Sequence, residues 1–316
     1  MKVTVCARKY PSPGGRVSLL VSLLENFPSI KIVSYENISG RFRKLRYNIK
    51  CWKFLRAENP DIVVGMGLAN ELSMLYARLF RKKGYYNLSG LRFNGYNFIS
   101  INVLSELISI LLCSRLIVPS DAAKERIQKY LPIFRKKVLV IPEGVRPIKN
   151  KAHIGTNIGF TRISYSDFER VYGQIAGNYS KFDSATLFFI KPEKIEIIKY
   201  GKLRTYEKSS MKELLPLLDC LFILPSSNHD YHSSSMLEAL EANVPFFITE
   251  VKFLERDVKP HFFMKNDNIK TIISKYADFR KNRKIYVAKY QKLRKRILSK
   301  YSYDKTIKTW KNLLGF

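Results

Sequence analysis

A polar stretch late in the chain, SSNHDYHSSSMLEALEANVPFF, carries the residue types that most directly suggest chemistry. Asp230 lies eight positions before Glu238, with three serines between them: Ser233, Ser234 and Ser235. The apolar run CLFIL precedes the stretch, and a helix-like segment and the apolar run VPFF follow its serines. We therefore expect it to join a strand to a helix. The free amides of a helix start, with serine hydroxyls, form a site for phosphate, and nearby carboxylates could bind sugar hydroxyls.

The same residues also stabilise a helix without any ligand. Serine and aspartate are favoured N-caps, and glutamate in a first turn interacts favourably with the helix dipole. Residue types and spacing therefore leave two interpretations open, an anion and sugar site or a capped helix.

Other loops offer weaker candidates. In PSPGGR, Gly14 and Gly15 would let the backbone approach a ligand just before a helix, although a tight turn without a ligand fits equally well. In GFTRIS, Arg162 could hold a diphosphate with two parallel hydrogen bonds, or be an ordinary exposed arginine. Ser120 and Asp121 in VPSDAAKE are predicted to form an N-cap, and GMGLAN is a further loop of interest.

Strand-like and helix-like segments alternate along the chain, which predicts βαβ units and mostly parallel sheets. The alternation restarts after RPIKNKAH, so we place a domain boundary near residues 146–153. In open α/β sheets, ligands bind outside the carboxyl ends of the strands, where the loops named above would lie. The sequence thus predicts an α/β protein with two doubly wound domains.

Several element predictions are specific enough to test. LANELSMLYARLFRKKG is predicted as a helix closed by Gly84, and KIEIIKYGKL as a strand. INVLSELISILLCSRLIV is interrupted by Glu106 and Arg115, so we expect a buried helix and a strand rather than a membrane span. The chain from Lys270 onward is predicted to be helical and very basic. The closing YDKTIKTWKNLLGF should be amphipathic, with its apolar residues on one side: Ile307, Trp310, Leu313 and Leu314.

The net charge of the 316-residue chain is +30, which suggests anionic partners such as nucleic acid, lipid headgroups or phosphorylated small molecules. A lysine-rich surface without such a partner is the alternative. A basic nucleic-acid-binding protein is a further alternative, which the absence of a helix-turn-helix, RRM or zinc signature disfavours. The segment RFRKLRYNIKCWKFLR suits an anionic membrane surface, or is an ordinary basic amphipathic helix.

The four cysteines, Cys6, Cys51, Cys113 and Cys220, form no CxxC pair and lie mostly in apolar runs. We expect reduced, buried thiols in a cytoplasmic protein. The start, MKVTVCARKYPSPGG, has no apolar core of a signal peptide. The four histidines show no metal-ligand spacing, and no metal site is predicted.

The order of PSPGG, RLIVPSDAAKERI, KVLVIPEGV, FILPSS and the D-x7-E-A-L-E-A-N-V-P pattern resembles the family 4 retaining glycosyltransferases of the GT-B fold. The resemblance extends from about Lys2 to Phe316. It implies two Rossmann-like domains facing a cleft, with residues 1–148 on the acceptor side and 149–298 on the nucleotide-sugar donor side. It also implies that a C-terminal helix, residues 299–316, returns to the first domain.

The resemblance also implies a role for each candidate. Glu238 would hold the ribose of the donor and Asp230 would lie near the transferred sugar. Gly14 and Gly15 would face the donor phosphates, and Arg162 would clamp the diphosphate. The amides of the serine loop, Ser233, Ser234 and Ser235, would meet the sugar and phosphate.

The implied reaction moves a hexose, with retention, from a nucleotide sugar such as a UDP- or GDP-sugar to a lipid-linked, glycan or protein acceptor. It needs no cofactor and no metal held by the protein, because cationic side chains and helix amides would stabilise the departing diphosphate.

The sequence departs from the family pattern at several points. Asp230 is one methylene shorter than the usual glutamate, Asn243 replaces a glycine, and the clamp lysine is missing, with Arg170 as a substitute. The first domain also lacks a histidine often found near the acceptor. A catalytically inactive binding or assembly protein of the same fold therefore stays open as an alternative, as does a peripheral position at the membrane.

Overall fold

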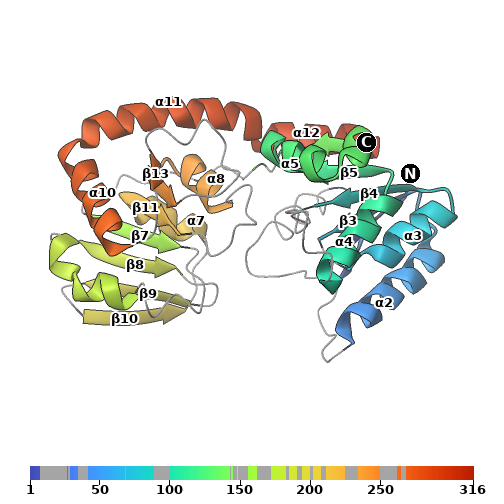
Figure 1. The fold of residues 1–316 in the computed structure, drawn as a ribbon, viewed down its shortest axis with the longest axis horizontal. Helices are drawn as coiled ribbons and strands as arrows, with labels where there is room; N and C mark the ends of the chain where they lie inside the picture. Colours follow the sequence, from blue (N-terminus) through green and yellow to red (C-terminus); the bar gives the residue numbers. More distant parts are fainter. Residues whose placement is uncertain are drawn as a thin grey trace. The chain divides into compact units, whose positions relative to one another are not determined.

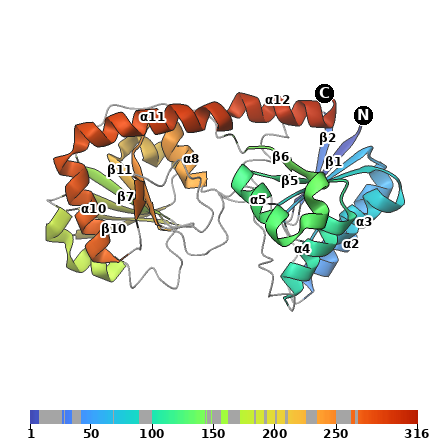
Figure 2. The same cartoon turned by 45° about the horizontal axis from the view of Figure 1, so that its top comes forward.

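A computed structural model describes residues 1–7, 27, 29–34, 42–67, 69–88, 100–142, 144, 148, 156–161, 172–182, 185–190, 194–199, 202–207, 211–224, 234–249, 262–264 and 268–316. The chain divides into two compact units. Unit 1 comprises Met1–Glu143 and Asp304–Phe316, and unit 2 comprises Gly144–Tyr303. Figure 1 labels their helices and strands, and Figure 2 shows the same elements from a second direction.

Unit 1 is built on a parallel six-stranded sheet in the order β2-β1-β3-β4-β5-β6. Its strands are β1 (Val3–Ala7), β2 (Ile30–Ser34), β3 (Ile62–Met66), β4 (Lys83–Asn87), β5 (Arg115–Val118) and β6 (Val138–Val140). Every residue of β1 and β3 is buried. Central parallel strands covered on both faces require such continuous apolar runs, which is why VTVCA and IVVGM show no alternation.

Most helices of unit 1 follow its strands in order, and the last one comes from the end of the chain. They are α2 (Arg43–Glu58), α3 (Glu71–Leu79), α4 (Ile101–Leu112), α5 (Asp121–Tyr130), the 3-10 helix η1 (Pro132–Lys137) and α12 (Tyr303–Leu314). Helices α2, α3 and α4 lie side by side (Figure 1). The predicted N-cap of α5 is confirmed, because the Ala123 amide donates to Ser120 Oγ at 3.2 Å.

The C-terminal helix α12 packs within unit 1. The Thr306 hydroxyl donates to the Pro142 carbonyl at 2.8 Å, and Trp310 and Leu314 are buried. The ring of Phe316 stacks on Phe27, with centroids 5.2 Å apart.

The prediction that Gly84 closes a helix is wrong. Helix α3 ends at Leu79, the left-handed residue that follows it is Arg81 at φ 52°, and Gly84 lies inside β4. The glycine is needed for packing instead, because a Cβ atom on Gly84 would come 2.9 Å from Ala77 Cβ.

Unit 2 has a seven-stranded sheet in the order β10-β9-β8-β7-β11-β12-β13. The strands are β7 (Asn157–Thr161), β8 (Thr186–Ile190), β9 (Lys194–Lys199), β10 (Lys202–Glu207), β11 (Cys220–Ile223), β12 (Phe246–Thr249) and β13 (Phe263–Met264). The segment predicted as a single strand, KIEIIKYGKL, instead contributes to two strands, because it includes all of β9 and the start of β10. Since β9 pairs antiparallel with both β8 and β10, the sheet is mixed rather than wholly parallel.

A row of phenylalanines crosses the centre of this sheet. Phe189, Phe160, Phe222 and Phe247 stand opposite one another on four adjacent strands. Their ring centroids are 5.3, 5.3 and 5.2 Å apart in that order. These contacts fix the relative register of β8, β7, β11 and β12, because a shift of one residue would move each ring to the other face.

Unit 2 contains both α-helices and short 3-10 helices. They are η2 (Tyr179–Phe182), α7 (Met211–Leu214), η3 (Leu215–Leu217), α8 (Ser234–Glu241), α10 (Ile269–Lys281) and α11 (Arg283–Tyr301). Helix α11 buries one face, carrying Tyr286, Tyr290, Leu293, Ile297 and Tyr301, in the core of unit 2.

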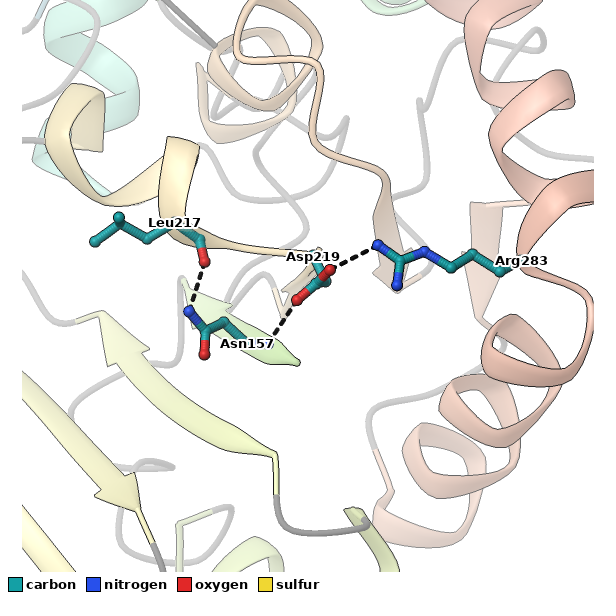
Figure 3. A network of polar contacts seen from close by, with 4 residues as sticks. All are labelled: Asn157, Leu217, Asp219 and Arg283. Atoms are coloured by element: carbon teal, nitrogen blue, oxygen red, sulfur yellow. Dashed lines mark hydrogen bonds and ion pairs between the residues drawn. The ribbon is translucent and has the colours of Figure 1, made fainter. Parts of the chain in front are cut away.

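A polar network joins the amino ends of β7 and β11 to the start of α11 (Figure 3). Asp219 Oδ2 accepts from the Asn157 amide at 2.7 Å, and Asp219 Oδ1 accepts from Arg283 Nη2 at 2.7 Å. The Asn157 side chain donates to the Leu217 carbonyl at 2.7 Å. The Asp219 side chain is only 6% exposed, so these donors supply the hydrogen bonds that a buried carboxylate requires.

All four cysteines are free and buried, as predicted from the sequence. Burial raises the pKa of the Cys113 thiol to about 12. Within the described residues, no helix combines the length and the apolar composition that crossing a bilayer requires.

Candidate functional site

The carboxyl edge of the unit 2 sheet contains a topological switch point between β7 and β11. The strand that follows β7 in sequence, β8, lies on one side of it, and β11 lies on the other. Ile223, the last residue of β11, is level with Thr161 of β7 and Ile248 of β12. The carboxyl edge at such a switch point is where α/β proteins form ligand sites.

Helix α8 begins after β11 and turns its less buried face outward. Met236, Leu237, Ala239 and Leu240 are at most 1% exposed. Glu238 is half-buried, as is Glu241 three positions later, so the two share a helix face. The Glu238 carboxylate thus lies near the start of α8, where free backbone amides favour negative charge on a ligand.

The structure describes three of the predicted site residues. Ser234 is the first residue of α8, Ser235 follows with 7% exposure, and Glu238 lies one turn later. Arg162 directly follows Thr161, the end of β7, and itself lies outside the described residues. The others outside them are Gly14, Gly15, Asp230 and Ser233.

The far end of α8 is held by side chains from α11. Tyr290 Oη donates to the Ala239 carbonyl at 2.9 Å, and Arg294 Nε donates to the Leu240 carbonyl at 2.6 Å. Burial raises the pKa of Glu241, while Arg294 has the opposite effect. Helix α11 therefore fixes the position of α8, and with it the position of Glu238.

Asn243 ends α8 in the left-handed conformation, with φ 57°. The Val244 amide donates to the Ala239 carbonyl at 2.8 Å and the Asn243 amide to the Leu240 carbonyl at 3.2 Å. These two bonds form a Schellman motif, in which glycine or asparagine is preferred. The replacement of glycine by Asn243 is thus compatible with the local backbone.

Sequence reasoning did not single out two hydroxyl side chains at this edge. Thr161 and Thr249 are the last residues of β7 and β12, and they are 5% and 7% exposed. The Thr161 carbonyl accepts from the Leu224 amide at 3.0 Å, which aligns the ends of β7 and β11. A threonine ending an otherwise apolar run was the available signal.

The carboxyl edge of unit 1 has its own switch point, between β1 and β3. Beyond β3, Gly67 and Ala69 both have positive φ values, 72° and 64°. The fully buried Asn70 follows, and its Nδ2 donates to the carbonyls of Met66 and Gly67, each at 3.1 Å. Asn70 Oδ1 is buried with no partner among the described residues. The loop of interest GMGLAN therefore contains an asparagine that shapes this edge.

No three His, Cys, Asp or Glu side chains come together as potential metal ligands in the part of the chain that the structure describes. The prediction that no metal is held by the protein stays a prediction.

Comparison with protein families gives one match, in the N-terminal part of the chain. Residues 1–148 match the family model described as Glycosyltransferase Family 4. This match confirms the resemblance inferred from the motifs over that part of the chain. A search of curated protein sequences gives no match.

Several solved structures resemble the chain along nearly all of its length. HepE from Anabaena in complex with UDP and glucose is 10% identical, with a TM-score of 0.70 and coverage of 100% of this chain and 99% of that one. A Listeria monocytogenes protein assigned as a UDP-N-acetylglucosamine 2-epimerase is 14% identical, with a TM-score of 0.67 and coverage of 97% of this chain and 94% of that one. A glycosyltransferase from Rickettsia africae is 11% identical, with a TM-score of 0.61 and coverage of 99% and 98%.

At these identities the structural likeness shows the fold. The chain has the GT-B fold, with two doubly wound α/β units and helices at its C-terminus, as the sequence predicts.

Proposed function

We propose that the protein is a glycosyltransferase that moves a hexose from a UDP- or GDP-sugar to a lipid-linked, glycan or protein acceptor, with retention and without a metal. The observation that carries the proposal is the position of Glu238 on the less buried face of α8, beside the switch point of β7 and β11. The family match of residues 1–148 supports it, as do similar structures solved with UDP, with UDP and glucose, and with UDP-glucose.

Unit 2 would bind the donor. Glu238 would accept hydrogen bonds from the ribose hydroxyls, and the amides at the start of α8 would bind phosphate oxygens. Ser233, Ser234 and Ser235 would contribute to the same loop, with Asp230 beside the transferred sugar. Arg162, directly after β7, would neutralise the departing diphosphate. Gly14 and Gly15 would approach the phosphates from the loop after β1.

The donor site is tested by nucleotide binding. Isothermal titration of UDP and GDP is compared for the wild-type protein, Glu238→Ala and Glu241→Ala. Glu241 is a matched control because it lies on the same face of α8 and is also half-buried. We expect Glu238→Ala to weaken binding roughly 10- to 100-fold, since hydrogen bonds to a charged group contribute about 1.5–3 kcal/mol.

Glu241→Ala should bind within about threefold of the wild-type protein, because it removes no predicted ligand contact. Equal affinity of the wild-type protein and Glu238→Ala would contradict the assigned role of Glu238. If the wild-type protein bound no nucleotide diphosphate, the donor site itself would be wrong.

A second candidate function is epimerisation of a nucleotide sugar, because UDP-N-acetylglucosamine 2-epimerases are among the similar structures. The two activities differ in their need for an acceptor. Incubation with UDP-N-acetylglucosamine alone would give its 2-epimer if the chain is an epimerase, and no epimer if it is a transferase. An inactive binding protein of the same fold would bind the nucleotide but turn over no donor, whether or not an acceptor is present.

A further inference from the structure

Helix α4 exposes an unbroken apolar stripe. Ile101, Leu104, Ile108 and Leu111 recur at helical spacing and are 72%, 54%, 36% and 58% exposed. They account for all the exposed residues of the helix, and its acid, Glu106, is 1% exposed. The expectation of a buried helix is therefore correct for one side of α4 only, because its other side presents aliphatic side chains.

Helix α2 extends this apolar surface. Lys44 Nζ donates to Asn102 Oδ1, which brings the first turn of α2 next to the first turn of α4. Phe42 and Leu45, on either side of Lys44, are 63% and 55% exposed, and Ile49 one turn later is 41% exposed. The aromatic Trp52, in contrast, packs edge-on against Tyr76 of α3, with ring centroids 5.8 Å apart.

The exposed apolar side chains concentrate in this part of the molecule. Among the described residues, nine of the fifteen large hydrophobic side chains that are exposed lie between Phe42 and Leu111. We call the outward surface of α2, α3 and α4 the helical face. Scattered exposed hydrophobic residues need no explanation, but a contiguous apolar patch marks an interaction surface.

Cations border the apolar residues of the helical face. Four exposed basic side chains lie along α2: Arg46, Lys50, Lys53 and Arg56. The acid at the end of α2, Glu58, is paired with Lys31 at 2.6 Å. A surface of aliphatic side chains edged by lysine and arginine is complementary to one leaflet of an anionic bilayer. The acyl chains of such a leaflet are apolar, and its headgroups carry negative charge.

We infer that the helical face docks this protein on an anionic bilayer surface. Helix α4 has 12 residues and is about 18 Å long, too short to cross a hydrocarbon core of about 30 Å, so it would lie in the interface. The stripe would enter the boundary between headgroups and acyl chains, and the cations of α2 would contact anionic headgroups. A second copy of this chain fits less well, because it would bring equal positive charges together.

This inference does not depend on the proposed sugar transfer. If that transfer is correct, however, docking has a consequence. The first turns of α2 and α4 follow the strand-to-helix connections, so they lie toward the carboxyl edge of the unit 1 sheet. A bilayer bound there would lie near the edge that the fold assigns to ligands, which suits a lipid-linked acceptor.

Vesicle flotation tests the inference without any donor. The wild-type protein, Leu104→Glu/Leu111→Glu, Lys53→Glu/Arg56→Glu and Ile285→Glu are floated with phosphatidylcholine vesicles, with and without added phosphatidylglycerol. We expect the wild-type protein to bind the anionic vesicles preferentially. The α4 variant should bind at least about tenfold more weakly, because it removes two aliphatic side chains from the interface and adds two charges that anionic headgroups repel. The α2 variant should lose the preference for anionic vesicles.

Ile285→Glu is the matched control, because Ile285 is an aliphatic residue of α11 that is 53% exposed and lies outside the helical face. It should float like the wild-type protein, and circular dichroism should show that all variants remain folded. Equal flotation of the wild-type and α4 variants would overturn the inference, as would equal binding of the wild-type protein to neutral and anionic vesicles. A wild-type dimer that fails to float and is dissociated by Leu104→Glu/Leu111→Glu would instead assign the face to a second copy.

Discussion

Asn243 shows how one residue can satisfy a backbone requirement that glycine usually meets. At φ 57° a side chain with a branched Cβ is strained, whereas asparagine is tolerated. We expect Asn243→Val to lower the free energy of unfolding by about 1–2 kcal/mol, and Asn243→Gly to change it by less than about 0.5 kcal/mol. Urea denaturation measures both values. Equal losses in the two variants would show that the Gln291 contact to Asn243 Oδ1, at 2.7 Å, matters more than the backbone.

Asp278 makes the stability of unit 2 depend on pH in the acidic range. Hydrogen bonds from the Tyr286 hydroxyl and then from Asn282 Nδ2 lower the pKa of Asp278. A lowered folded pKa stabilises the protein above the unfolded value of about 3.9, and this stabilisation is lost as the pH falls through the folded value. The difference in unfolding free energy between the wild-type protein and Asp278→Asn should therefore be largest above about pH 5 and shrink on acidification.

Denaturation series at several pH values check this expectation. Tyr286→Phe removes the principal donor, so it should flatten the same acid limb. A pH-independent difference between Asp278→Asn and the wild-type protein would show that the carboxylate is not stabilised in the folded state.

The polar network that links β7 and β11 to helix α11 contributes to stability, and we expect Asp219 to contribute more than Arg283. Asp219→Ala removes the acceptor of the partly buried Asn157 amide and the ion-pair partner of Arg283, and we expect a loss of about 2–3 kcal/mol. Arg283 is 57% exposed, and its removal leaves the Asn157 amide bonded to Asp219. Arg283→Ala should therefore cost about 1 kcal/mol or less. Chemical denaturation of the two variants compares them, and the reverse order would contradict this assignment.

Gly84 tests the close packing of α3 on β4. A methyl group at this position would meet Ala77 Cβ at 2.9 Å, so Gly84→Ala should lower stability by about 1–3 kcal/mol. Gly173 offers the matched control, since it is exposed and helical and a Cβ there meets nothing within 4 Å. Gly173→Ala should raise stability by about 0.4–1 kcal/mol through the unfolded state. Thermal melts measure the stability of both variants. A melting temperature of Gly84→Ala equal to that of the wild-type protein would contradict the close packing inferred here.

Local sequence patterns predict most of these elements, and packing explains the exceptions. Apolar runs such as VTVCA and CLFI could be identified because a strand covered on both faces needs them. Strand β4 was missed because its sequence, KGYYN, begins with the lysine and glycine that also end helices. Its strand conformation depends on pairing with β3 and β5, which local propensity does not contain.

The sequence points to the connection that carries the candidate site, and the roles of its residues stay predictions. The β11–α8 connection was identified because a polar run after an apolar strand falls at a carboxyl edge. The exposed stripe of α4 was not, because a sequence with few charges looks the same whether its outer side is covered or open. Only the position of α4 in the layer with α2 and α3 decides which of its aliphatic residues stay exposed.

The molecule as a whole consists of two units, each with its own sheet. Both tryptophans of the chain, Trp52 and Trp310, belong to unit 1, so tryptophan fluorescence reports on that unit while circular dichroism reports on both. A separate core lets each unit unfold on its own. Asp219→Ala, in unit 2, should therefore shift the unfolding of that unit to a lower urea concentration. Circular dichroism should show this as a separate early transition, while the midpoint measured by tryptophan fluorescence should not move.

Gly84→Ala, in unit 1, supplies the reciprocal measurement, because it should lower the fluorescence midpoint directly. The comparison of two variants with two probes separates local from shared stability without any ligand. If each variant moved both probes by the same amount, the units would unfold as one cooperative system. The free energies expected for Asp219 and Gly84 would then belong to the whole chain rather than to separate cores.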